Sequence, residues 1–394
     1  MKLLFLCQSS PLKEGGAETR NREVARHLAA LGHQVTVLCA KTSPGDPAEL
    51  SWEGVRILQK KVLPDFLLRK YPYPSYLPLA AANLFLAFHL LRLLRKERFD
   101  ALREDISPVP PSGLLALIRF PGIQRSAIVH NLAPNLGLWF DYYGRAFGTV
   151  GYLMNRLLRG GWLRYDAIVC DGKWFAEELQ KHAAIANRVE FIPNGVGGAF
   201  FDDRSENRSG ARILAVGRLV EIKGHRFLLE ALARIAGKHP ELRLSIYGGG
   251  PLREALIELG RELGIADRVS FEASRPSEAM PEVYRGHDLF VMPSLFEGLP
   301  LALLEAMAGK LPVLVSDISA FRSVLDERSA LFFTKADSED LAAKLSWALE
   351  HRPELTKMTG LAQSKAHAYR WENISALELA KMVGPQGKEA RAHG

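Results

Sequence analysis

Apolar and polar positions alternate along the first half of the chain with two different periods. Short apolar runs have the length of buried strands, and they fall at residues 2–8, 33–40, 55–60, 99–105, 126–131, 165–171 and 189–195. Between the first two runs, residues 19–32 carry apolar side chains at helical spacing, and Gly32 is typical of a helix end. Strands that alternate with helices predict a parallel, doubly wound α/β sheet.

The alternation starts afresh at Arg212. Six further strand-like runs follow, each with a helix behind it, and the last of these helices is predicted at 338–350. The polar stretch 202–210 between the two halves is predicted to be a linker. Residues 371–383 form one more predicted helix, and the polar tail behind it has the composition of a disordered segment. The length of 394 residues is sufficient for two α/β domains with full cores.

The stretch 294–308 carries the strongest functional signal. A loop leads here into an apolar helix, in which Pro300 suits the first helical position and Gly309 the end. The N–H groups at the start of such a helix favour an anion. Glu297 lies in the loop and Glu305 a turn inside the helix, so two hydroxyl-accepting carboxylates flank the anion position. The stretch therefore indicates a sugar that carries phosphate, and two solvated glutamates on an amphipathic helix are the alternative.

Two upstream loops add basic residues and glycines. The run 212–217 leads into Arg218 and Lys223, which could clamp two phosphates at the carboxyl end of a strand. The run 242–251 ends in three glycines, which let a backbone approach a ligand closely. Arg253 stands where the dinucleotide-binding fingerprint needs a third glycine, so that fingerprint is absent. Each loop alone also fits an ordinary solvated turn, but together with the helix they describe a nucleotide-sugar site.

The order of these motifs resembles that of the retaining nucleotide-sugar glycosyltransferases of family 4. The shared motifs are GGAE at 15–18, IPNGV at 192–196, Gly217-Arg218 with Lys223-Gly224, the glycine-rich turn, and Glu297 followed by Glu305. The resemblance covers roughly residues 1–380. It implies the GT-B fold, in which two Rossmann-like doubly wound domains face each other across a cleft. The implied division is an acceptor-binding domain at 1–203, a nucleotide-sugar-binding domain at 204–370, and residues 371–394 as a helix that crosses back to the first domain, with the tail.

The resemblance also implies a role for each motif residue. The residues implied in catalysis are His130, Arg218, Lys223 and Glu297. Those implied in donor binding are Gly15, Gly16, Gly217, Gly249, Gly298, Leu299 and Glu305. A lone histidine is more often structural, but His130 matches a family histidine that lies against the transferred sugar, and it is not expected to be a general base. Glu297 is expected to contact the donor sugar and Glu305 to accept the ribose hydroxyls.

The implied mechanism is retaining and independent of metal. The acceptor attacks the face from which the leaving group departs, and the departing phosphate takes the acceptor proton. Arg218 and Lys223 then stabilise charge on the leaving diphosphate. Neither Asp202-Asp203 in the linker nor Glu104-Asp105 is positioned by a strand against the phosphate loop, so no metal site is predicted. No cofactor is expected, because the nucleoside-diphosphate sugar is a substrate.

Composition and charge bear on location and partners. Apolar residues make up 47% of the chain and charged residues 24%, which are ordinary globular values. Cys7, Cys39 and Cys170 are unclustered, which favours reduced thiols in the cytoplasm, and no secretory signal is expected. The net charge of +7 fits an anionic membrane surface. Nucleic acid is not an expected partner, because no reading module is visible.

The apolar run 77–94 is long enough to raise the question of a membrane span. It leads directly into the strand at 99–105, so no span is predicted. The run is either a buried helix or an interfacial helix whose basic residues contact lipid headgroups, namely Arg92, Arg95, Lys96 and Arg98. The stretch 136–165 adds aromatic residues and arginines. The second reading predicts a peripheral protein of the cytoplasmic membrane face, with a lipid-linked or glycan acceptor.

Two other functional classes stay open. A sugar-nucleotide epimerase of the same fold acts on one bound sugar nucleotide, and release of nucleoside diphosphate on transfer distinguishes the two. A non-catalytic subunit of this fold typically lacks the phosphate clamp, whereas Arg218, Lys223, Glu297 and Glu305 are all present. The sugar, the base and the acceptor are not specified by any motif.

Overall fold

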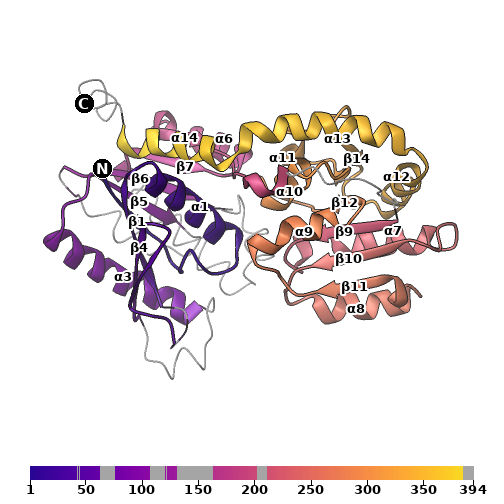
Figure 1. Ribbon diagram of the computed structural model, residues 1–394, viewed down its shortest axis with the longest axis horizontal. Helices are drawn as coiled ribbons and strands as arrows, with labels where there is room; N and C mark the ends of the chain where they lie inside the picture. Colours follow the sequence, from indigo (N-terminus) through magenta and orange to yellow (C-terminus); the bar gives the residue numbers. More distant parts are fainter. Residues whose placement is uncertain are drawn as a thin grey trace. The chain divides into compact units, whose positions relative to one another are not determined.

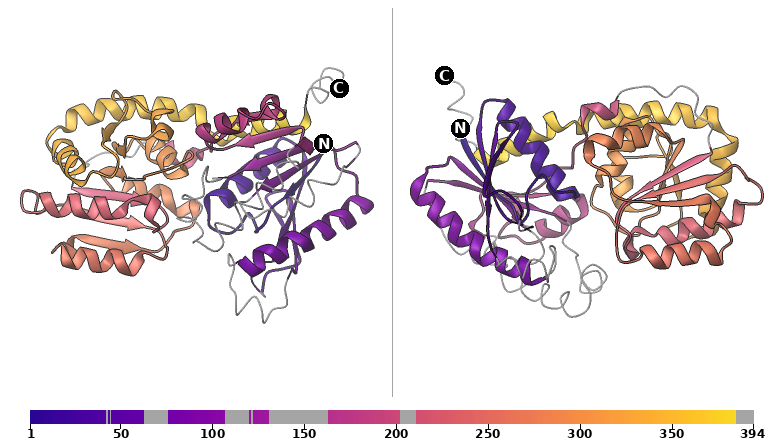
Figure 2. Two further views of the ribbon diagram at one scale, coloured as in Figure 1. Left: turned by 180° about the vertical axis from the view of Figure 1, so that it is seen from behind. Right: turned by 60° about the horizontal axis from the view of Figure 1, so that its bottom comes forward.

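The chain forms two compact α/β units. The structure is a computed structural model, and it describes all residues except 42, 44, 63–75, 107–119, 121, 131–162, 202–210 and 385–394. Unit 1 comprises Met1–Pro193 with Trp371–Gly394, and unit 2 comprises Asn194–Arg370 (Figure 1, Figure 2). The division falls between Pro193 and Asn194, ahead of the boundary at 203 expected from the sequence. The expected linker 202–210 lies outside the described residues.

Unit 1 is built on an eight-stranded sheet with the order β3-β4-β2-β1-β5-β6-β7-β8. Its strands are β1 Lys2–Leu6, β2 Gln34–Ala40, β3 Glu49–Trp52, β4 Val55–Lys60, β5 Ala101–Ile106, β6 Gln124–Val129, β7 Ala167–Cys170 and β8 Val189–Phe191. All neighbours pair in parallel except β3, which is antiparallel to β4. The predicted parallel sheet is thus confirmed, and the β3–β4 hairpin adds an edge strand that the sequence reading missed.

Helices cover both faces of this sheet. They are α1 Gly16–Ala30, α3 Tyr76–Lys96, α6 Lys173–Gln180 and α14 Trp371–Val383. On one face, Leu4 and Leu6 of β1 pack with Leu86 and Leu90 of α3. Helices α1 and α14 lie side by side over the other face (Figure 1). The C-terminal helix is therefore an integral part of unit 1.

Unit 2 contains a six-stranded, fully parallel sheet with the order β11-β10-β9-β12-β13-β14. Its strands are β9 Arg212–Val216, β10 Arg243–Tyr247, β11 Val269–Glu272, β12 Leu289–Met292, β13 Val313–Ser316 and β14 Leu331–Phe333. Its helices are α7 His225–Ile235, α8 Arg253–Glu262, α9 Met280–Arg285, α10 Leu301–Ala308, α11 Ser319–Arg322, α12 Ser338–Glu350 and α13 Arg352–Ala366. The six strands and the helix at 338–350 agree with the sequence prediction, and so does the helix at 371–383, which is α14 of unit 1.

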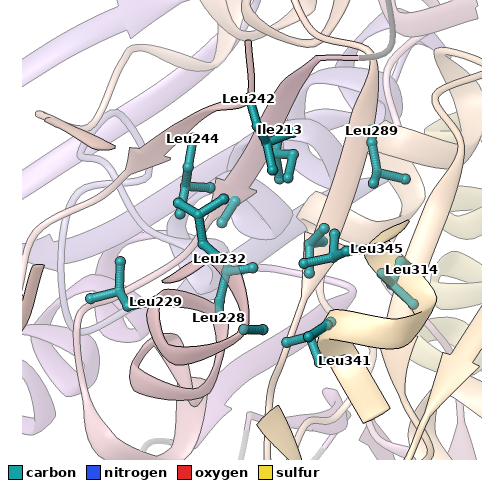
Figure 3. Close-up of a cluster of buried hydrophobic side chains, with 14 of the residues drawn as sticks. Ile213, Leu228, Leu229, Leu232, Leu242, Leu244, Leu289, Leu314, Leu341 and Leu345 are labelled. Carbon is teal, nitrogen blue, oxygen red and sulfur yellow. The ribbon is translucent and has the colours of Figure 1, made fainter. Parts of the chain in front are cut away.

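Aliphatic side chains hold the helices of unit 2 against its sheet. Leu228 and Leu232 of α7 and Leu345 of α12 are fully buried against Ile213 of β9 and Leu244 of β10 (Figure 3). Burial of one such side chain contributes about 1.5–3 kcal/mol. This core fixes the strand ends from which the loops of the site arise.

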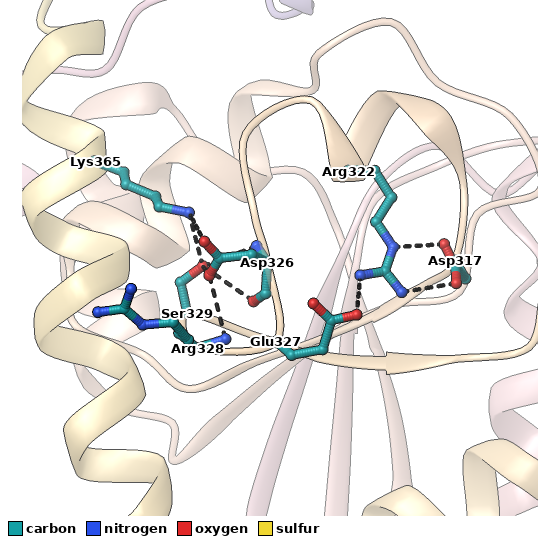
Figure 4. Close-up of polar contacts among 7 residues, drawn as sticks. All are labelled: Asp317, Arg322, Asp326, Glu327, Arg328, Ser329 and Lys365. Carbon is teal, nitrogen blue, oxygen red and sulfur yellow. Dashed lines mark hydrogen bonds and ion pairs between the residues drawn. The ribbon is translucent and has the colours of Figure 1, made fainter.

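Polar contacts attach the last helix of unit 2. Lys365 Nζ of α13 lies 2.9 Å from Asp326 Oδ2, and this bond together with one from Ser329 lowers the pKa of Asp326 to about 2 (Figure 4). Arg322 bridges Asp317 and Glu327 in the same region. These side chains are partly or fully exposed to solvent, so each pair contributes at most about 1 kcal/mol.

In each sheet the chain adds strands first on one side of the first strand and then on the other side. This topological switch point lies between β1 and β5 in unit 1 and between β9 and β12 in unit 2. Ligands of open α/β sheets bind at the carboxyl ends of strands at such points. In the part of the chain that the structure describes, no helix is long and apolar enough to cross a bilayer.

Candidate functional site

The loops that follow β9 and β12 meet at the switch point of unit 2. Leu295 N donates to the carbonyl of Ile222 at 2.7 Å. Gly224 allows this contact, because its φ is +65° and a Cβ there would approach the Pro293 oxygen to 2.1 Å. The two loops are thus held against each other by backbone packing.

Lys223 and Glu297 form an ion pair across these loops. Lys223 Nζ lies 2.5 Å from Glu297 Oε1, and the hydroxyl of Ser294 donates to the same oxygen at 2.7 Å. Glu297 and Ser294 are buried, and Lys223 is partly exposed. The structure therefore brings together two residues that the sequence placed in the site and adds Ser294, which the sequence reading missed.

Arg218 and the glycine-rich turn lie beside this pair. The loop after β10 contacts the loop after β9, with Gly217 N bonded to the Tyr247 oxygen at 3.0 Å. A Cβ on Gly248 would lie 2.0 Å from the Gly217 oxygen. Gly249 is exposed, and its carbonyl accepts from Leu219 N at 2.9 Å. The side chain of Arg218 is exposed.

Helix α10 begins one residue later than the sequence predicted. Pro300 is its N-cap, with an extended ψ of 139°, and Leu301 is the first helical residue. The ring of proline fixes φ in either position, so only the ψ of Pro300 differs from the expectation: it is extended instead of helical. Gly309 ends the helix as predicted. Gly298 and Leu299 are buried immediately ahead of the cap, where they lead the chain toward the helix N-terminus.

The IPNGV motif supports this helix start. Asn194 Nδ2 donates to the Leu299 carbonyl at 2.7 Å, and both residues are buried. The amide thus satisfies a carbonyl in the loop before α10. The sequence reading noted the motif but assigned no contact to Asn194.

Glu305 lies on α10 one turn inside the helix, and a tyrosine of α9 holds it. Tyr284 donates its hydroxyl to Glu305 Oε2 at 2.7 Å. Burial raises the pKa of Glu305 to about 7, although the hydrogen bond from Tyr284 opposes the shift. Glu305 therefore changes charge close to neutral pH. The sequence contains no motif that points to Tyr284.

His130 follows β6 in unit 1 and lies between two aspartates. Its Nδ1 is 2.9 Å from Asp171 Oδ2, and its Nε2 is 3.3 Å from Asp105 Oδ1. Burial favours the neutral ring, but the two carboxylates outweigh it and raise the pKa of His130 to about 9. Both ring nitrogens of this imidazolium face carboxylates, so it has no lone pair with which to accept a proton.

The glycine-bearing loop after β1 reaches the same edge of the unit 1 sheet. Gly15 is the N-cap of α1 with φ +152°, and a Cβ there would lie 2.1 Å from Glu18 Oε2. Gly16 is the first residue of the helix. Ser9 donates to Glu18 Oε1 at 2.6 Å, and burial raises the pKa of Glu18. Gly15, Gly16 and His130 thus arise from loops at one edge, and Ser9 and Glu18 join them.

Glu104 and Asp105 lie on opposite faces of β5, because adjacent strand residues alternate. Glu104 is buried against Arg125, and Tyr165 donates to its Oε2 at 3.0 Å. Asp105 faces Asn21 and His130 instead. Among the described residues, no group of three or more His, Cys, Asp or Glu side chains is arranged to hold a metal ion.

Comparison with known proteins assigns the family. Residues 14–197 match the family described as Glycosyltransferase Family 4, and residues 199–365 match Glycosyl transferases group 1. Mannosylfructose-phosphate synthase of Agrobacterium fabrum is 31% identical over 44% of this chain and 41% of its own length. Phosphatidyl-myo-inositol mannosyltransferase of Mycolicibacterium smegmatis is 27% identical over 100% and 97%. The chain spans about half or less of the length of several curated relatives that it matches.

Solved structures agree with the fold. Sucrose-phosphate synthase from Thermosynechococcus elongatus covers 100% of both chains with a TM-score of 0.78 and 19% identity. HepE of Anabaena, solved in complex with UDP-glucose, covers 96% of this chain and 99% of its own with a TM-score of 0.70 and 17% identity. The chain belongs to the group 1 glycosyltransferases of family 4, and its fold is GT-B, as the sequence predicted.

Proposed function

We propose that this protein is a retaining glycosyltransferase that moves a hexose-type sugar from a nucleoside-diphosphate sugar to an acceptor hydroxyl. The observation that supports this most is the Lys223–Glu297 pair beside Arg218 at the switch point of the unit 2 sheet. The ammonium group of Lys223 and the guanidinium group of Arg218 can each bind one phosphate of a diphosphate. The family supplies the class of reaction.

Lys223 and Arg218 act as the diphosphate clamp in this proposal. The ammonium group of Lys223 has three donor positions, so it can keep its bond to Glu297 and also donate to a phosphate oxygen. Arg218 is exposed and can present its planar fork to the second phosphate. As the bond to the sugar breaks, both cations stabilise the charge that builds up on the leaving group.

The sugar and the ribose are bound by the start of α10 in the same proposal. Glu297 and the N–H groups of Gly298 and Leu299 contact the donor sugar, where the helix terminus favours negative charge. Glu305, held by Tyr284, accepts the ribose hydroxyls. Gly217 and Gly249 let the backbone lie close to the donor, and Gly15 and Gly16 do so from the first loop of unit 1.

His130 serves as a fixed positive charge against the transferred sugar. Since both of its nitrogens face aspartates, the acceptor proton goes to the departing phosphate and not to the imidazole. The reaction then needs no protein general base and no metal ion, because the charge on the leaving diphosphate is balanced by Lys223 and Arg218.

A donor panel tests this proposal. UDP-glucose, UDP-N-acetylglucosamine and GDP-mannose are screened by thermal shift, because a donor at 100 times its Kd adds about 2.7 kcal/mol to stability. The stabilising donor is then offered with acceptor glycans and lipids, in buffer with EDTA. We expect release of nucleoside diphosphate that depends on the acceptor, and proton NMR of the fresh product should show the anomeric configuration of the donor.

Each part of the proposal has its own contrary result. Interconversion of the sugar nucleotide without acceptor indicates an epimerase, and donor binding without turnover indicates a non-catalytic subunit. An inverted linkage contradicts retention. Loss of activity in EDTA with recovery in Mg²⁺ or Mn²⁺ contradicts metal independence.

We further propose that the protein is peripheral on an anionic membrane at the cytoplasmic face, with a lipid-linked or glycan acceptor. In α3, Leu86 and Leu90 are buried in the core, whereas Phe85 and Phe88 are 46% and 60% exposed. The exposed phenylalanines continue into the exposed basic residues Arg92, Arg95 and Lys96. Apolar and cationic groups on one helix face match the requirements of a lipid interface. The stretch 136–162, which the sequence reading included in this surface, lies outside the described residues.

A further inference from the structure

The C-terminal helix contributes one buried carboxylate to the interior of unit 1. Glu378 of α14 is 1% exposed and lies between two arginines. Arg20 Nε of α1 donates to its Oε1 at 2.7 Å, and Arg103 Nε of β5 donates to its Oε2 at 2.8 Å. Arg20 also donates to the carbonyl of Pro193 at 2.8 Å. A carboxylate buried this deeply is retained only with partners, and here both oxygens have one.

These contacts continue to His130 through two hydrogen bonds and an ion pair. Arg103 Nη1 donates to Asn21 Oδ1 at 2.6 Å, and Asn21 Nδ2 donates to Asp105 Oδ2 at 2.8 Å. The other oxygen of Asp105 is the one that lies 3.3 Å from His130 Nε2. The amide of Asn21 can only have this orientation, because its oxygen must face the guanidinium and its NH2 group the carboxylate.

The charges along this path balance only with α14 in place. The path contains three cations and three carboxylates, which are Arg20, Arg103, His130, Glu378, Asp105 and Asp171. Without Glu378 the interior keeps two guanidinium groups and loses the carboxylate that both contact. An uncompensated buried charge is strongly unfavourable, so Arg103 should shift toward its other hydrogen-bond partner, Asn21, and disturb the bond from Asn21 to Asp105.

We propose that Glu378 is a positioning residue for His130, and that it acts through Arg103, Asn21 and Asp105. By holding Arg103, it keeps Asn21 bonded to one oxygen of Asp105 and leaves the other oxygen for the imidazolium. The C-terminal helix is then part of the unit 1 site although it contains no motif residue. The consequence for catalysis rests on the proposed function, in which His130 lies against the transferred sugar.

The sign of the effect on His130 follows from the groups around it. Asp105 faces the ring from β5, Asp171 from the end of β7 and Glu18 from α1, while Arg103 and Cys7 lie near Asp105. The carboxylates hold the pKa of His130 above its usual value. When Arg103 loses Glu378, it shifts together with Asn21, and the Asp105 carboxylate that Asn21 holds moves away from the imidazolium. The pKa of His130 should therefore fall.

The test compares Glu378→Gln, which removes the charge and keeps the shape, with the wild type. The His130 resonance, assigned with His130→Gln in protein labelled with ¹³C-histidine, is titrated by NMR without substrate. We expect its pKa to fall by about one unit in Glu378→Gln. In an assay of transfer, kcat should fall about tenfold while the donor KM changes less than about threefold, because the ring is misplaced and the donor loops of unit 2 are intact.

Two further variants separate this path from a general loss of charge or structure. Glu372→Gln removes an exposed carboxylate from the same helix, which lies 3.5 Å from His27 of α1, and it should leave the pKa of His130 unchanged. Glu378→Gln in an Asn21→Leu background should shift the pKa of His130 much less than in the wild type, because the path is already cut. Equal shifts in both backgrounds overturn the proposal, since the effect would then be transmitted through space.

Asn21→Leu alone keeps the test decisive if Glu378→Gln does not fold. This variant leaves the Glu378 ion pairs in place and removes a donor that stabilises the Asp105 carboxylate. The Asp105 carboxylate then stabilises the imidazolium more strongly, so the pKa of His130 should rise. An unchanged pKa contradicts the proposal. Because the titration needs no turnover, a wild type without transfer activity refutes the proposed function and leaves this test intact.

Discussion

Lys223 forms an ion pair with the buried Glu297, whereas Arg218 is exposed. Removal of these two clamp residues, Lys223 and Arg218, should therefore affect folding stability differently. Lys223→Ala removes the cation that pairs with the buried Glu297 and leaves the bond from Ser294, which should cost about 1–3 kcal/mol of folding stability. Arg218→Ala removes an exposed side chain and should leave the melting temperature near that of the wild type. Both should lower kcat/KM by about tenfold to several hundredfold, the equivalent of one charge-assisted hydrogen bond.

The control for this prediction restores the charge balance. Lys223→Ala combined with Glu297→Gln should recover much of the lost stability and none of the activity. Arg226→Ala changes another exposed arginine close to the loop and should leave both quantities unaltered. Near-normal kcat/KM in Arg218→Ala or Lys223→Ala refutes the clamp, and equal melting temperatures for the two refute the role of the ion pair in stability.

Tyr284 and Glu305 give the site a pH dependence. The pKa of Glu305 is raised to about 7 in the folded protein, so the folded state binds this proton more tightly than the unfolded state. The resulting stabilisation is fully present below the usual carboxyl pKa and is lost as the pH rises through about 7. Tyr284→Phe removes a hydrogen bond that favours the charged form, so its penalty should be larger at pH 8 than at pH 5, by about 1 kcal/mol. Urea unfolding of both proteins at the two pH values measures the difference.

Glu305→Gln is the matched control for the tyrosine. In that background no carboxylate ionises at position 305, so Tyr284→Phe should cost the same at pH 5 and pH 8. A pH-independent penalty in the presence of Glu305 contradicts the assignment. The tyrosine itself could not be found from sequence, because its contact to α10 joins residues 21 positions apart through tertiary packing alone.

At the level of elements, the start of α10 depends on a residue outside its own loop. Asn194→Ala should leave the buried carbonyl of Leu299 without its amide donor, at a cost of about 1–3 kcal/mol. The loop 298–300 should also be less fixed, and kcat/KM should fall with it. Thermal unfolding and steady-state kinetics measure the two effects. Asn194→Asp keeps the shape of the side chain but replaces the amide donor by a negative charge, so it should be at least as damaging. Unchanged stability and activity in Asn194→Ala would exclude a role of Asn194 in holding the start of α10.

Much of the element order could be predicted from sequence, because buried parallel strands appear as continuous apolar runs. The runs at 2–8, 212–217 and 242–251 become the strands β1, β9 and β10. Strand β4 was predicted at 55–60, but its hairpin partner β3 was missed, since β3 is a half-exposed edge strand without an apolar run. Its two-residue turn, Glu53-Gly54, has positive φ at both positions and is the signal that could have revealed it.

The site was predictable to the extent that loops at strand ends carry recognisable motifs. Glu297 and Lys223 were named from sequence, and the structure shows that they contact each other. Asp171 ends an apolar run in the same way as His130 and could have been named by the same reasoning. Arg103 and Glu378 could not, because a charged residue within a strand or on a helix gives no sign of burial until its partner, here 275 positions away, is known.

On the scale of the whole molecule, net charge and one helix face bear on where the protein acts. The chain carries a net charge of +7. Sequence alone left the run 77–94 as either a core helix or an interfacial helix. The structure shows that α3 has one buried and one exposed face, since Leu86 and Leu90 are buried while Phe88 is 60% exposed. The two faces of one helix can therefore serve the core of unit 1 and a lipid surface.

Membrane binding should depend on both kinds of exposed residue in α3. Each basic residue near an anionic surface contributes about 1 kcal/mol, and salt screens this attraction. The protein should therefore co-sediment with phosphatidylglycerol vesicles at low salt, less at high salt, and weakly with neutral phosphatidylcholine vesicles. Arg92→Glu with Arg95→Glu should release it, and Phe85→Ala with Phe88→Ala should weaken the binding that remains at high salt, because insertion of apolar side chains is not screened.

Charge reversal at two exposed arginines of unit 2, Arg226→Glu with Arg261→Glu, changes the net charge equally and is the matched control. It should leave vesicle binding close to that of the wild type if α3 is the contact surface. Equal release by both pairs means that net charge alone attracts the protein to lipid. A wild type that does not co-sediment with anionic vesicles at low salt refutes the membrane proposal, and the acceptor should then be sought among soluble glycans. None of these changes touches a residue of the donor site, so thermal shift with the donor should be preserved throughout.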